Sequence, residues 1–377
     1  MKIIVLGAGL VGKAMALDLA SEPEFSLTSV DLKQEALAEL ATAGIKVIGQ
    51  DISQSEATKD LVSDYDLVIN AVPGYLGFQS LKACLEAGRN VVDISFFPEN
   101  PFELDSLAKG QNITAAVDCG VAPGLSNILA GYGLSQLDKA YSVMIYVGGL
   151  PVIRKWPFEY NAVFSPVDVI EEYLRPARCL ENGQLVIKPA LSEPEFLEFE
   201  KLGTLEAFIT DGLRTMIETL TVPEMVEKTL RYPGHREKML ALRQAGFFSE
   251  QPVEIAGQKV RPVDLSAKIL FPRLNVEAGE EDLTILRVVV SGEKDGQPLR
   301  LTYDLFDRFD RKSGIHSMAR TTGYTATAVA RAVARGLIKK TGIIAPEFLG
   351  LEPEVFNFIR KELLNREIVI KEKKEAG

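Results

Sequence analysis

The chain has 377 residues, a net charge of −10 and a hydrophobic content of 46%. This length suffices for two domains with ample cores, and the acidic balance argues against nucleic acid as a partner, because neutralising phosphates needs a basic face. Every apolar run is shorter than the ~20 residues of a membrane span, so we expect neither a membrane segment nor a membrane partner. Because the N-terminus starts directly with a core strand, we also expect no cleaved signal and a cytoplasmic location.

The few cysteines and histidines exclude two other classes of site. The chain has three widely spaced cysteines and two histidines, so the sequence predicts neither a disulfide framework nor a metal centre. A reducing compartment fits this composition best.

A glycine-rich turn follows the first predicted strand. Residues 1–6 are mostly aliphatic, and they lead into Gly7-x-Gly9-x-x-Gly12 and then into apolar residues at helical spacing. In a dinucleotide-binding fold the first glycine permits the tight turn, the second lets the pyrophosphate approach, and the third lets the helix pack on the strand. The pattern predicts a dinucleotide along Gly7, Ala8, Gly9, Leu10, Val11 and Gly12, and the alternative is a connector that binds nothing.

The next strand indicates which dinucleotide binds. Residues 25–31 form the second predicted strand, and Asp31 ends it about 20 residues after the turn, where a carboxylate accepts hydrogen bonds from the ribose. A 2′-phosphate would be repelled there and would need an arginine, whereas the only nearby cation is Lys33. We therefore expect NAD rather than NADP.

Polar or small residues follow each of the later strands as well. Strands are predicted at 45–48, 66–70, 90–95 and 113–117, with helical patterns between them. In an open parallel sheet the carboxyl ends of the strands share one edge, where ligands bind. The residues expected on this cofactor rim are Asp51, Ile52, Asn70, Ala71, Val72, Pro73, Asp93, Ser95, Cys119 and Gly120. For Asp51 the alternative is the N-cap of the following helix.

After a helix over residues 125–137 the alternation of strand and helix stops. A strand at 141–147 and hairpins that turn at Gly257 and at Asp295-Gly296 predict a mainly antiparallel or mixed sheet. The fold class is therefore α/β: a doubly wound Rossmann domain over 1–124, an α+β substrate and dimerisation domain over 125–315, and a helical segment over 316–377 that packs back on the first domain. Helices are expected around 326–333 and 353–365, and the charged tail over 371–375 is expected to fray.

Four motifs resemble the saccharopine dehydrogenase superfamily, and within it the lysine 6-dehydrogenases. They are the stretches 118–124 (DCGVAPG), 146–151 (YVGGLP), 230–235 (LRYPGH) and 319–325 (ARTTGYT). The resemblance implies NAD(P)-dependent oxidation at a carbon that bears an amine, a second domain that builds the substrate pocket, and a homodimer. Residues 93–98 and 210–214 depart from the lysine 6-dehydrogenase pattern, and Phe96 and Phe97 would make one pocket wall more apolar.

Two residues are candidates for handling protons. Asp118 follows a strand beside the predicted nicotinamide position, where partial burial would raise the pKa of a carboxylate toward useful values. His235 lies in a turn of a motif that matches the family. The alternatives are a helix cap for Asp118 and a structural histidine for His235. Cys119 is interpreted as a small buried residue rather than a nucleophile, because no histidine is expected beside it.

An amino-acid substrate also needs a carboxylate clamp, for which arginine is suited. Arg214, Arg231 and Arg320 are the candidates, and Asp211 or Glu159 could hold a distal ammonium. Trp156 could form a lid or an interface.

The sequence predicts an NAD-dependent amino-acid dehydrogenase that acts on a C–N bond, most similar to oxidative deamination by lysine 6-dehydrogenases. The first alternative is imine reduction of the saccharopine reductase or carboxynorspermidine type. The second is a regulatory protein that binds NAD without turnover.

Overall fold

The structure is a computed structural model that describes residues 1–162, 166–274, 276–277 and 279–376, without the side chains of 166–168. It comprises two compact units. The first joins Met1–Gln136 to Met318–Ile370, and the second joins Leu137–Ser317 to the residues from Lys371 onward. The first unit extends past the predicted boundary at residue 124, because helix α6 (Leu125–Ser135) packs against helix α12 (Pro346–Leu351) of the same unit.

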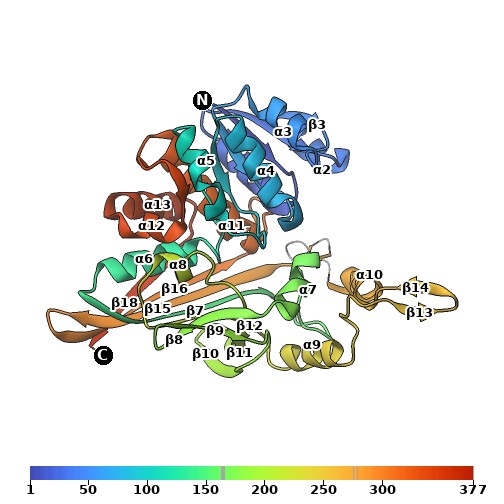
Figure 1. Cartoon of the computed structure of the whole chain (residues 1–377), viewed down its shortest axis with the longest axis vertical. Helices are drawn as coiled ribbons and strands as arrows, with labels where there is room; N and C mark the ends of the chain where they lie inside the picture. Colours follow the sequence, from blue (N-terminus) through green and yellow to red (C-terminus); the bar gives the residue numbers. More distant parts are fainter. Residues whose placement is uncertain (163–165, 275, 278, 377) are drawn as a thin grey trace. The chain divides into compact units, whose positions relative to one another are not determined.

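A parallel sheet forms the centre of the first unit (Figure 1). In the described residues its strand order is β17-β6-β5-β4-β1-β2-β3, which is the Rossmann order with β17 added at one edge. The strands are β1 (Lys2–Leu6), β2 (Ser26–Asp31), β3 (Lys46–Gly49), β4 (Leu67–Asn70), β5 (Asn90–Asp93), β6 (Thr114–Ala116) and β17 (Gly342–Ile344).

Apolar runs explain why this sheet is covered on both faces. All four residues of β4 are buried, as are the last four of β1, so neither strand has a wet face. The remaining helices of the unit are α1 (Leu10–Ala20), α2 (Gln34–Thr42), α3 (Ser55–Val62), α4 (Gly74–Glu86), η1 (Pro101–Leu104), α5 (Asp105–Gly110), α11 (Ser317–Ala334) and α13 (Pro353–Asn365). The helices expected around 326–333 and 353–365 are confirmed as parts of α11 and α13.

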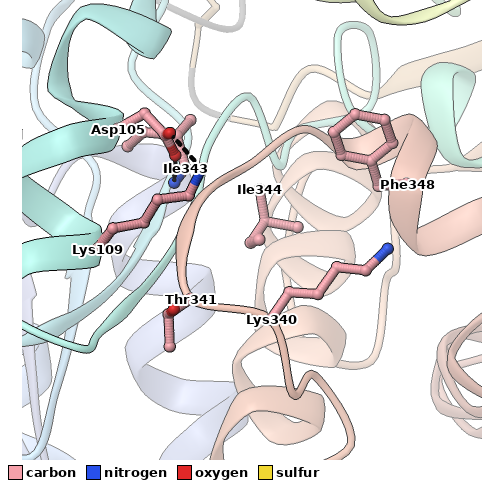
Figure 2. A pocket seen from close by; sticks show the side chains of 7 residues that line it. All are labelled: Asp105, Lys109, Lys340, Thr341, Ile343, Ile344 and Phe348. Atoms are coloured by element: carbon pink, nitrogen blue, oxygen red, sulfur yellow. Dashed lines mark hydrogen bonds and ion pairs between the residues drawn. The ribbon is translucent and has the colours of Figure 1, made fainter.

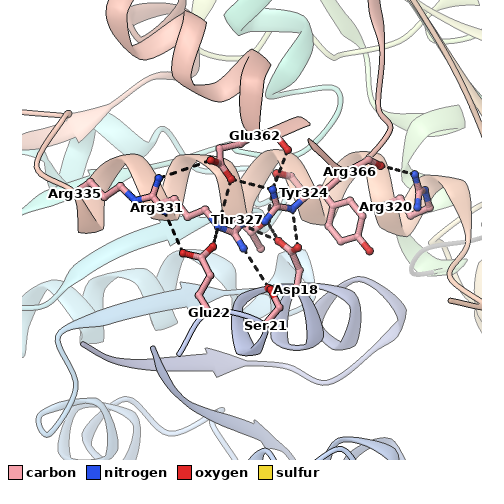
Figure 3. Close-up of polar contacts among 10 residues, drawn as sticks. All are labelled: Asp18, Ser21, Glu22, Arg320, Tyr324, Thr327, Arg331, Arg335, Glu362 and Arg366. Atoms are coloured by element: carbon pink, nitrogen blue, oxygen red, sulfur yellow. Dashed lines mark hydrogen bonds and ion pairs between the residues drawn. The ribbon is translucent and has the colours of Figure 1, made fainter. Parts of the chain in front are cut away.

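An ionic cluster joins the C-terminal part of the first unit, Met318–Ile370, to helix α1 and the residues just after it (Figure 3). The Arg331 guanidinium of α11 is fully buried, and its NH1 lies 2.8 Å from Asp18 Oδ2 while its Nε pairs with Glu22 and, at 3.5 Å, with Glu362 Oε2. Arg366 bridges the same acids, with its Nε 2.6 Å from Asp18 Oδ1 and its NH1 2.9 Å from Glu362 Oε2. Ion pairs therefore hold α11 and the residue that follows α13 to the N-terminal helix.

The second unit is built on a mixed sheet, which confirms the predicted fold class. Its main path in the described residues is β10-β11-β12-β7-β15-β16-β18, with β8 paired to β12 and β9. Along this path β7 and β12 run parallel, whereas the pairs β10-β11, β11-β12, β7-β15 and β15-β16 are antiparallel. The strands are β7 (Lys139–Pro151), β8 (Ala177–Glu181), β9 (Gln184–Lys188), β10 (Glu195–Phe199), β11 (Gly203–Ile209), β12 (Glu224–Arg231), β15 (Asp282–Lys294), β16 (Gln297–Arg308) and β18 (Ile370–Ala376).

The two predicted hairpins are present, whereas the prediction of a frayed tail is wrong. Strands β15 and β16 pair across Asp295-Gly296, and β13 (Val253–Ile255) pairs with β14 (Gln258–Val260) across Gly257. The tail forms β18 beside β16. Its charged side chains are compatible with this position, because charges are common on edge strands, where they prevent further pairing.

Four helices complete the described part of the second unit: α7 (Pro166–Leu174), α8 (Met216–Thr219), α9 (His235–Gln244) and α10 (Pro262–Leu274). Side chains of α7, α9 and α10 share one apolar cluster with Phe208 of β11. Among the described residues, no helix of either unit combines the length and apolar character needed to cross a membrane.

Candidate functional site

The glycine turn has the geometry of a phosphate-binding loop. Gly7 has a φ of +101°, and its N–H donates to the Val30 carbonyl at 2.8 Å. A Cβ on Gly12 would lie 2.1 Å from the Gly7 carbonyl oxygen, whereas a Cβ on Gly9 would have no atom within 4 Å. Gly12 is therefore required by packing inside the protein, and Gly9 borders open space at the start of α1. This is the cradle that a pyrophosphate needs.

The contrast between these glycines gives a matched pair of variants. We expect Gly9→Ala to fold normally and to lose affinity for nicotinamide dinucleotides by at least ~10-fold, because the methyl group would occupy the open space. We expect Gly12→Ala to lose ~1–3 kcal/mol of stability through overpacking. Thermal unfolding and the fluorescence of bound NADH measure the two effects. Unchanged NADH affinity in Gly9→Ala would contradict the phosphate assignment.

Asp31 lies beside this turn, as the sequence predicts. Its Oδ2 accepts the Ala8 N–H at 2.8 Å and its Oδ1 accepts the Lys33 N–H at 2.8 Å. Asp51 is exposed and accepts the Ser53 N–H at 2.9 Å, and the hydrogen bonds from Ser53 lower the pKa of Asp51. Helix α3 has Gln54 as its N-cap, so the alternative that Asp51 caps this helix is wrong. Ile52 follows, half-buried.

Three of the predicted rim residues form one buried network. The Asn70 Nδ2 donates to Asp93 Oδ2, and the Ser95 N–H donates to Asp93 Oδ1 at 2.8 Å. The Ser80 hydroxyl of α4 donates to Asn70 Oδ1 at 3.0 Å. Burial, and next to it the charge of Asp118, raise the pKa of Asp93 to about 8 despite its hydrogen bonds. Ala71, Val72 and Pro73 lead from this network into α4, with Pro73 as the N-cap.

Asp118 is buried at the carboxyl end of β6 and has a φ of 52°. The next N–H, that of Cys119, donates to the Asp93 carbonyl at 2.8 Å, which links the loop to the network. Burial raises the pKa of the Cys119 thiol well above its ordinary value, and the charges of Asp93 and Asp118 add to this. A neutral thiol is a poor nucleophile, in agreement with the interpretation of Cys119 as a packing residue.

The rest of the 118–124 loop is fixed by close packing. Gly120 pairs with Gly124, and a Cβ on Gly124, whose φ is +132°, would lie 2.0 Å from the Gly120 carbonyl. The Asn127 side chain accepts the Gly124 N–H at 3.1 Å and donates to the buried Glu347 at 3.2 Å. The loop therefore has one well-defined conformation.

In the second unit Arg231 is buried in an aromatic setting. Its NH2 lies 3.0 Å from Glu172 Oε2, and its guanidinium carbon lies 4.2 Å from the centre of the Tyr160 ring. The Nε of Arg231 and the hydroxyl of Tyr160 are buried without a hydrogen-bond partner among the described residues. No sequence motif indicated Glu172 or Tyr160, because a single acid or aromatic residue has no signature of its own.

His235 is closely engaged. Its Nδ1 lies 2.8 Å from the Phe158 carbonyl oxygen and its Nε2 lies 2.9 Å from the Tyr173 hydroxyl. Burial, together with the charge of Arg231, lowers the pKa of His235 to about 3. The ring is therefore neutral near pH 7, with Nδ1 as donor and Nε2 as acceptor, and this arrangement is typical of a structural histidine.

Three of the other substrate candidates, Asp211, Glu159 and Arg320, have partners within their own units. Both carboxylate oxygens of Asp211 pair with Arg178, at 3.0 and 3.1 Å, and Glu159 pairs with Arg154. Arg320, in the first unit, donates to the Arg366 carbonyl at 2.8 Å. Arg214 is buried with a φ of 53°.

The two stretches that depart from the lysine 6-dehydrogenase pattern lie in packed surroundings. Phe97 is fully buried in the core of the first unit, 5.7 Å from Phe78 between ring centres, so the expectation that its ring lines a pocket wall is wrong. In the second unit Thr210 donates to Glu227 Oε2 at 2.6 Å. Burial raises the pKa of Glu227 to about 8, and no sequence motif indicated this buried acid.

Two further features lie apart from the predicted site residues described above. A surface pocket of about 340 Å³ in the first unit (Figure 2) contains none of the predicted site residues. Its Lys109 pairs with Asp105 at 2.7 Å, and Asp105 also accepts the Ile343 N–H at 3.0 Å. Trp156 is 80% exposed, and the Lys238 ammonium lies over its ring, 5.1 Å from the ring centre. In the part of the chain that the structure describes, no His, Cys, Asp and Glu side chains gather in a way that could hold a metal ion.

Comparison with known proteins adds to this geometry. The saccharopine dehydrogenase NADP-binding domain model matches residues 3–116, and the saccharopine dehydrogenase C-terminal domain model matches residues 120–369. Among solved structures, an apo L-Glu-forming saccharopine dehydrogenase from Saccharomyces cerevisiae has a TM-score of 0.81 and 21% identity, with 100% of both chains covered. This likeness confirms the fold.

Curated relatives extend over different shares of the chain. An NADP(+)-dependent, L-glutamate-forming saccharopine dehydrogenase from Schizosaccharomyces pombe is 23% identical over 98% of this chain and 99% of its own length. A carboxyaminopropylagmatine dehydrogenase from Synechocystis is 22% identical, with 93% and 94% covered. The bovine mitochondrial alpha-aminoadipic semialdehyde synthase is 27% identical over 66% of this chain, which spans only 28% of that longer protein.

Proposed function

We propose, because the chain belongs to the saccharopine dehydrogenase family, that it oxidises an amino acid at a carbon that bears nitrogen, with lysine or a related compound as substrate. At the level of the family, the chain is an NAD(P)-dependent oxidoreductase acting on C–N bonds. The observation that carries the finer proposal is the buried carboxyl of Asp118, which follows β6 at the strand-end rim that also carries the glycine turn.

The first unit fits a nicotinamide dinucleotide. Its glycine turn is open at Gly9 and closed at Gly7 and Gly12, and the Asp31 carboxylate ends the neighbouring strand. When bound, the nicotinamide supplies the hydride acceptor. The N–H groups at the start of α1 would hold its phosphates, and Asp31 would hold its ribose.

Asp118 is proposed as the group that moves protons. Oxidation of an amine requires an uncharged nitrogen, so a base must take a proton from the substrate ammonium. Transfer of hydride to the oxidised nicotinamide would leave an imine, and water would add to its carbon to release a carbonyl product together with ammonia from a primary amine or an amine from a secondary amine. An aspartate in a fixed loop can accept the first proton and assist the attack of water.

Arg231 is proposed to hold the substrate carboxylate. Its guanidinium is buried, ordered by the Tyr160 ring, and retains a donor without a partner. A buried arginine binds a carboxylate more strongly than an exposed one because water competes less. Glu172, already 3.0 Å from the same guanidinium, can hold an ammonium group of an amino acid.

The substrate panel is the decisive experiment. Purified protein is incubated with NAD+ or NADP+ and with lysine, ornithine, saccharopine or diamines, and the reduced nicotinamide is followed by absorbance. The reverse reaction uses NAD(P)H with a keto acid and an amine. Turnover of saccharopine but not of lysine would favour the second candidate, a secondary-amine dehydrogenase or imine reductase, which the full-length relatives support. NADH binding without turnover in either direction would leave a regulatory protein.

The preference for NAD rests on Asp31, although the matching family model is named for NADP. We expect Asp31→Ala to weaken NAD at least ~10-fold more than NADP, because a charge-assisted hydrogen bond to the ribose is worth ~1.5–3 kcal/mol. The variant also removes the hydrogen bonds that Asp31 accepts from the N–H groups of Ala8 and Lys33, which affects both cofactors. The measurement is therefore the ratio of the dissociation constants for NAD and NADP. Asp51→Ala is the control, because its effect should be equal for both cofactors. An equal loss in Asp31→Ala would contradict the preference.

A further inference from the structure

Residues 253–274, here called the arm, leave an apolar face exposed. They comprise the hairpin β13–β14 and helix α10 of the second unit (Figure 1). Val253 pairs with Val260 across the hairpin, and Ile255 follows Val253 by two residues, so the three side chains project from one face. Val253 is 46% exposed and Ile255 is 50% exposed. Because an isolated two-stranded sheet is marginally stable at best, this face needs a cover.

Helix α10 leaves further apolar side chains exposed. Leu265 and Ile269 lie one turn apart and therefore share a face of the helix, and both are exposed. The Ser266 hydroxyl donates to the Phe247 carbonyl at 2.7 Å, which ties the helix to the residues that precede the hairpin. Both elements of the arm therefore present apolar side chains from a fixed base, as is typical of contact surfaces.

The arm is basic, although the whole chain has a net charge of −10. It contains two acids and four cations, and the cations are all exposed: Lys259, Arg261, Lys268 and Arg273. The Arg261 NH2 lies 2.6 Å from Asp264 Oδ1, so the charges of this pair cancel. The charge that remains is positive, and it favours an acidic apolar surface as the partner of the arm.

Strands β9 and β10 of the same unit carry exposed apolar side chains of their own. In the described residues β9 pairs only with β8 and β10 lies at the end of the sheet beside β11, so both strands have an open side. Leu185 and Ile187 alternate along β9 and share one face. Together with Phe196 of β10 they are more than half exposed.

Acids accompany these apolar side chains. Residues 193–200 contain no cation and four glutamates: Glu193, Glu195, Glu198 and Glu200. The Lys188 ammonium at the end of β9 pairs with Glu193, which brings the end of β9 next to the start of this stretch. Residues 184–200, here called the acidic edge, are therefore complementary to the arm in both polarity and charge.

We propose that the arm of one copy of this chain docks on the acidic edge of a second copy, and that the second copy returns the contact. Two equal contacts then close a dimer with two-fold symmetry. The occupant is a second copy because this chain carries both complementary surfaces. The arm does not cover the acidic edge of its own chain, since the apolar side chains of both surfaces are exposed. This inference is independent of the proposed chemistry, and it gives the predicted homodimer a specific interface.

Two charge variants test the contact. Ile255→Asp places an acid on the arm and Phe196→Lys places a cation on the acidic edge, and both variants should fold because the natural side chains are exposed. Sedimentation velocity over a dilution series is expected to show a dimer of the natural protein, and a dissociation constant at least ~10-fold higher in each variant. Ile153→Asp is the control, because Ile153 is an exposed residue of the same unit outside both surfaces. Its dissociation constant should be unchanged, and thermal unfolding verifies that all three variants are folded.

Mixing the two variants distinguishes an arm-to-edge contact from any other. In the mixed dimer the arm of Phe196→Lys meets the edge of Ile255→Asp, which is a natural contact, and the other contact joins the two introduced charges of opposite sign. The mixture should therefore dimerise at least ~10-fold more tightly than either variant alone. Higher salt should weaken the natural dimer, because exposed charges are screened.

Four results would overturn the proposal. They are a natural protein that stays monomeric at ~100 μM, a dimer that neither variant weakens, a mixture that recovers no affinity, and an assembly larger than a dimer, which would mean that the contact does not close. A dimer with the expected behaviour but without turnover on any substrate would refute only the proposed function.

Discussion

Asp118→Asn is expected to lower turnover by at least ~100-fold while leaving the affinity for NADH within a few-fold of the natural value. The amide has the size of the carboxyl but cannot accept the substrate proton. The backbone hydrogen bond from Cys119 to Asp93 holds the 118–124 loop directly after this residue. The variant should therefore keep the conformation of the loop. Steady-state kinetics with the best substrate of the panel measure the loss, and NADH fluorescence measures binding.

Cys119→Ala is the matched control for this variant. It changes the neighbouring buried residue in the same loop, whose raised thiol pKa makes it neutral, so turnover should stay within a few-fold. If Asp118→Asn retains the natural turnover, Asp118 has a structural role and the proton is moved elsewhere. If both variants lose turnover equally, the loop is sensitive to any change, and the specific role of the carboxyl is refuted.

Arg331→Met is expected to lower the free energy of unfolding by ~3–5 kcal/mol. The side chain is fully buried and forms ion pairs with Asp18, Glu22 and Glu362 (Figure 3). Methionine fills the space but leaves these acids with fewer counter-charges in a site that water reaches poorly. Urea unfolding followed by circular dichroism measures the loss.

Arg335→Met provides the comparison for this position. Arg335 directly follows α11 and pairs with two of the same acids, at 3.2 Å from Glu22 and 3.7 Å from Glu362, but its side chain is 45% exposed. Exposed ion pairs are worth about 0–1 kcal/mol, so the variant should be nearly as stable as the natural protein. Equal losses in both variants would show that burial does not set the energy of this cluster.

Local patterns made the strand ends of the first unit predictable. The spacing of Gly7, Gly9 and Gly12 placed the turn, Asp31 and Asn70 each end a strand as expected, and Asp93 ends β5 two residues before the predicted end of that strand. The same patterns do not say where a side chain points once the sheet has formed. Asn70, Asp93 and Ser95 were expected on a cofactor rim, and in the structure their side chains bond to one another.

Long-range contacts were not predictable. Arg331 contacts acids more than 300 residues away in the sequence, and no local pattern encodes such a pairing. Tyr173 and Tyr160 come from separate segments to surround His235. Phe97 was expected near a pocket because its stretch departs from the family pattern, but the side chain packs into the core. Its neighbour Gly77 leaves no room for a Cβ, which would lie 2.7 Å from the Phe97 ring.

The first unit is discontinuous in the sequence, and this has a consequence for its synthesis. Strand β17 pairs with β6, and Arg331 and Arg366 neutralise Asp18, yet all three come from the last 60 or so residues of the described chain. When residues 1–136 have left the ribosome, their sheet still has an open edge at β6, and Asp18 of their first helix still lacks its arginine partners. Open strand edges invite pairing with other chains. The cofactor-binding unit therefore begins to fold first and is completed only after residues 137–317 of the second unit have been made.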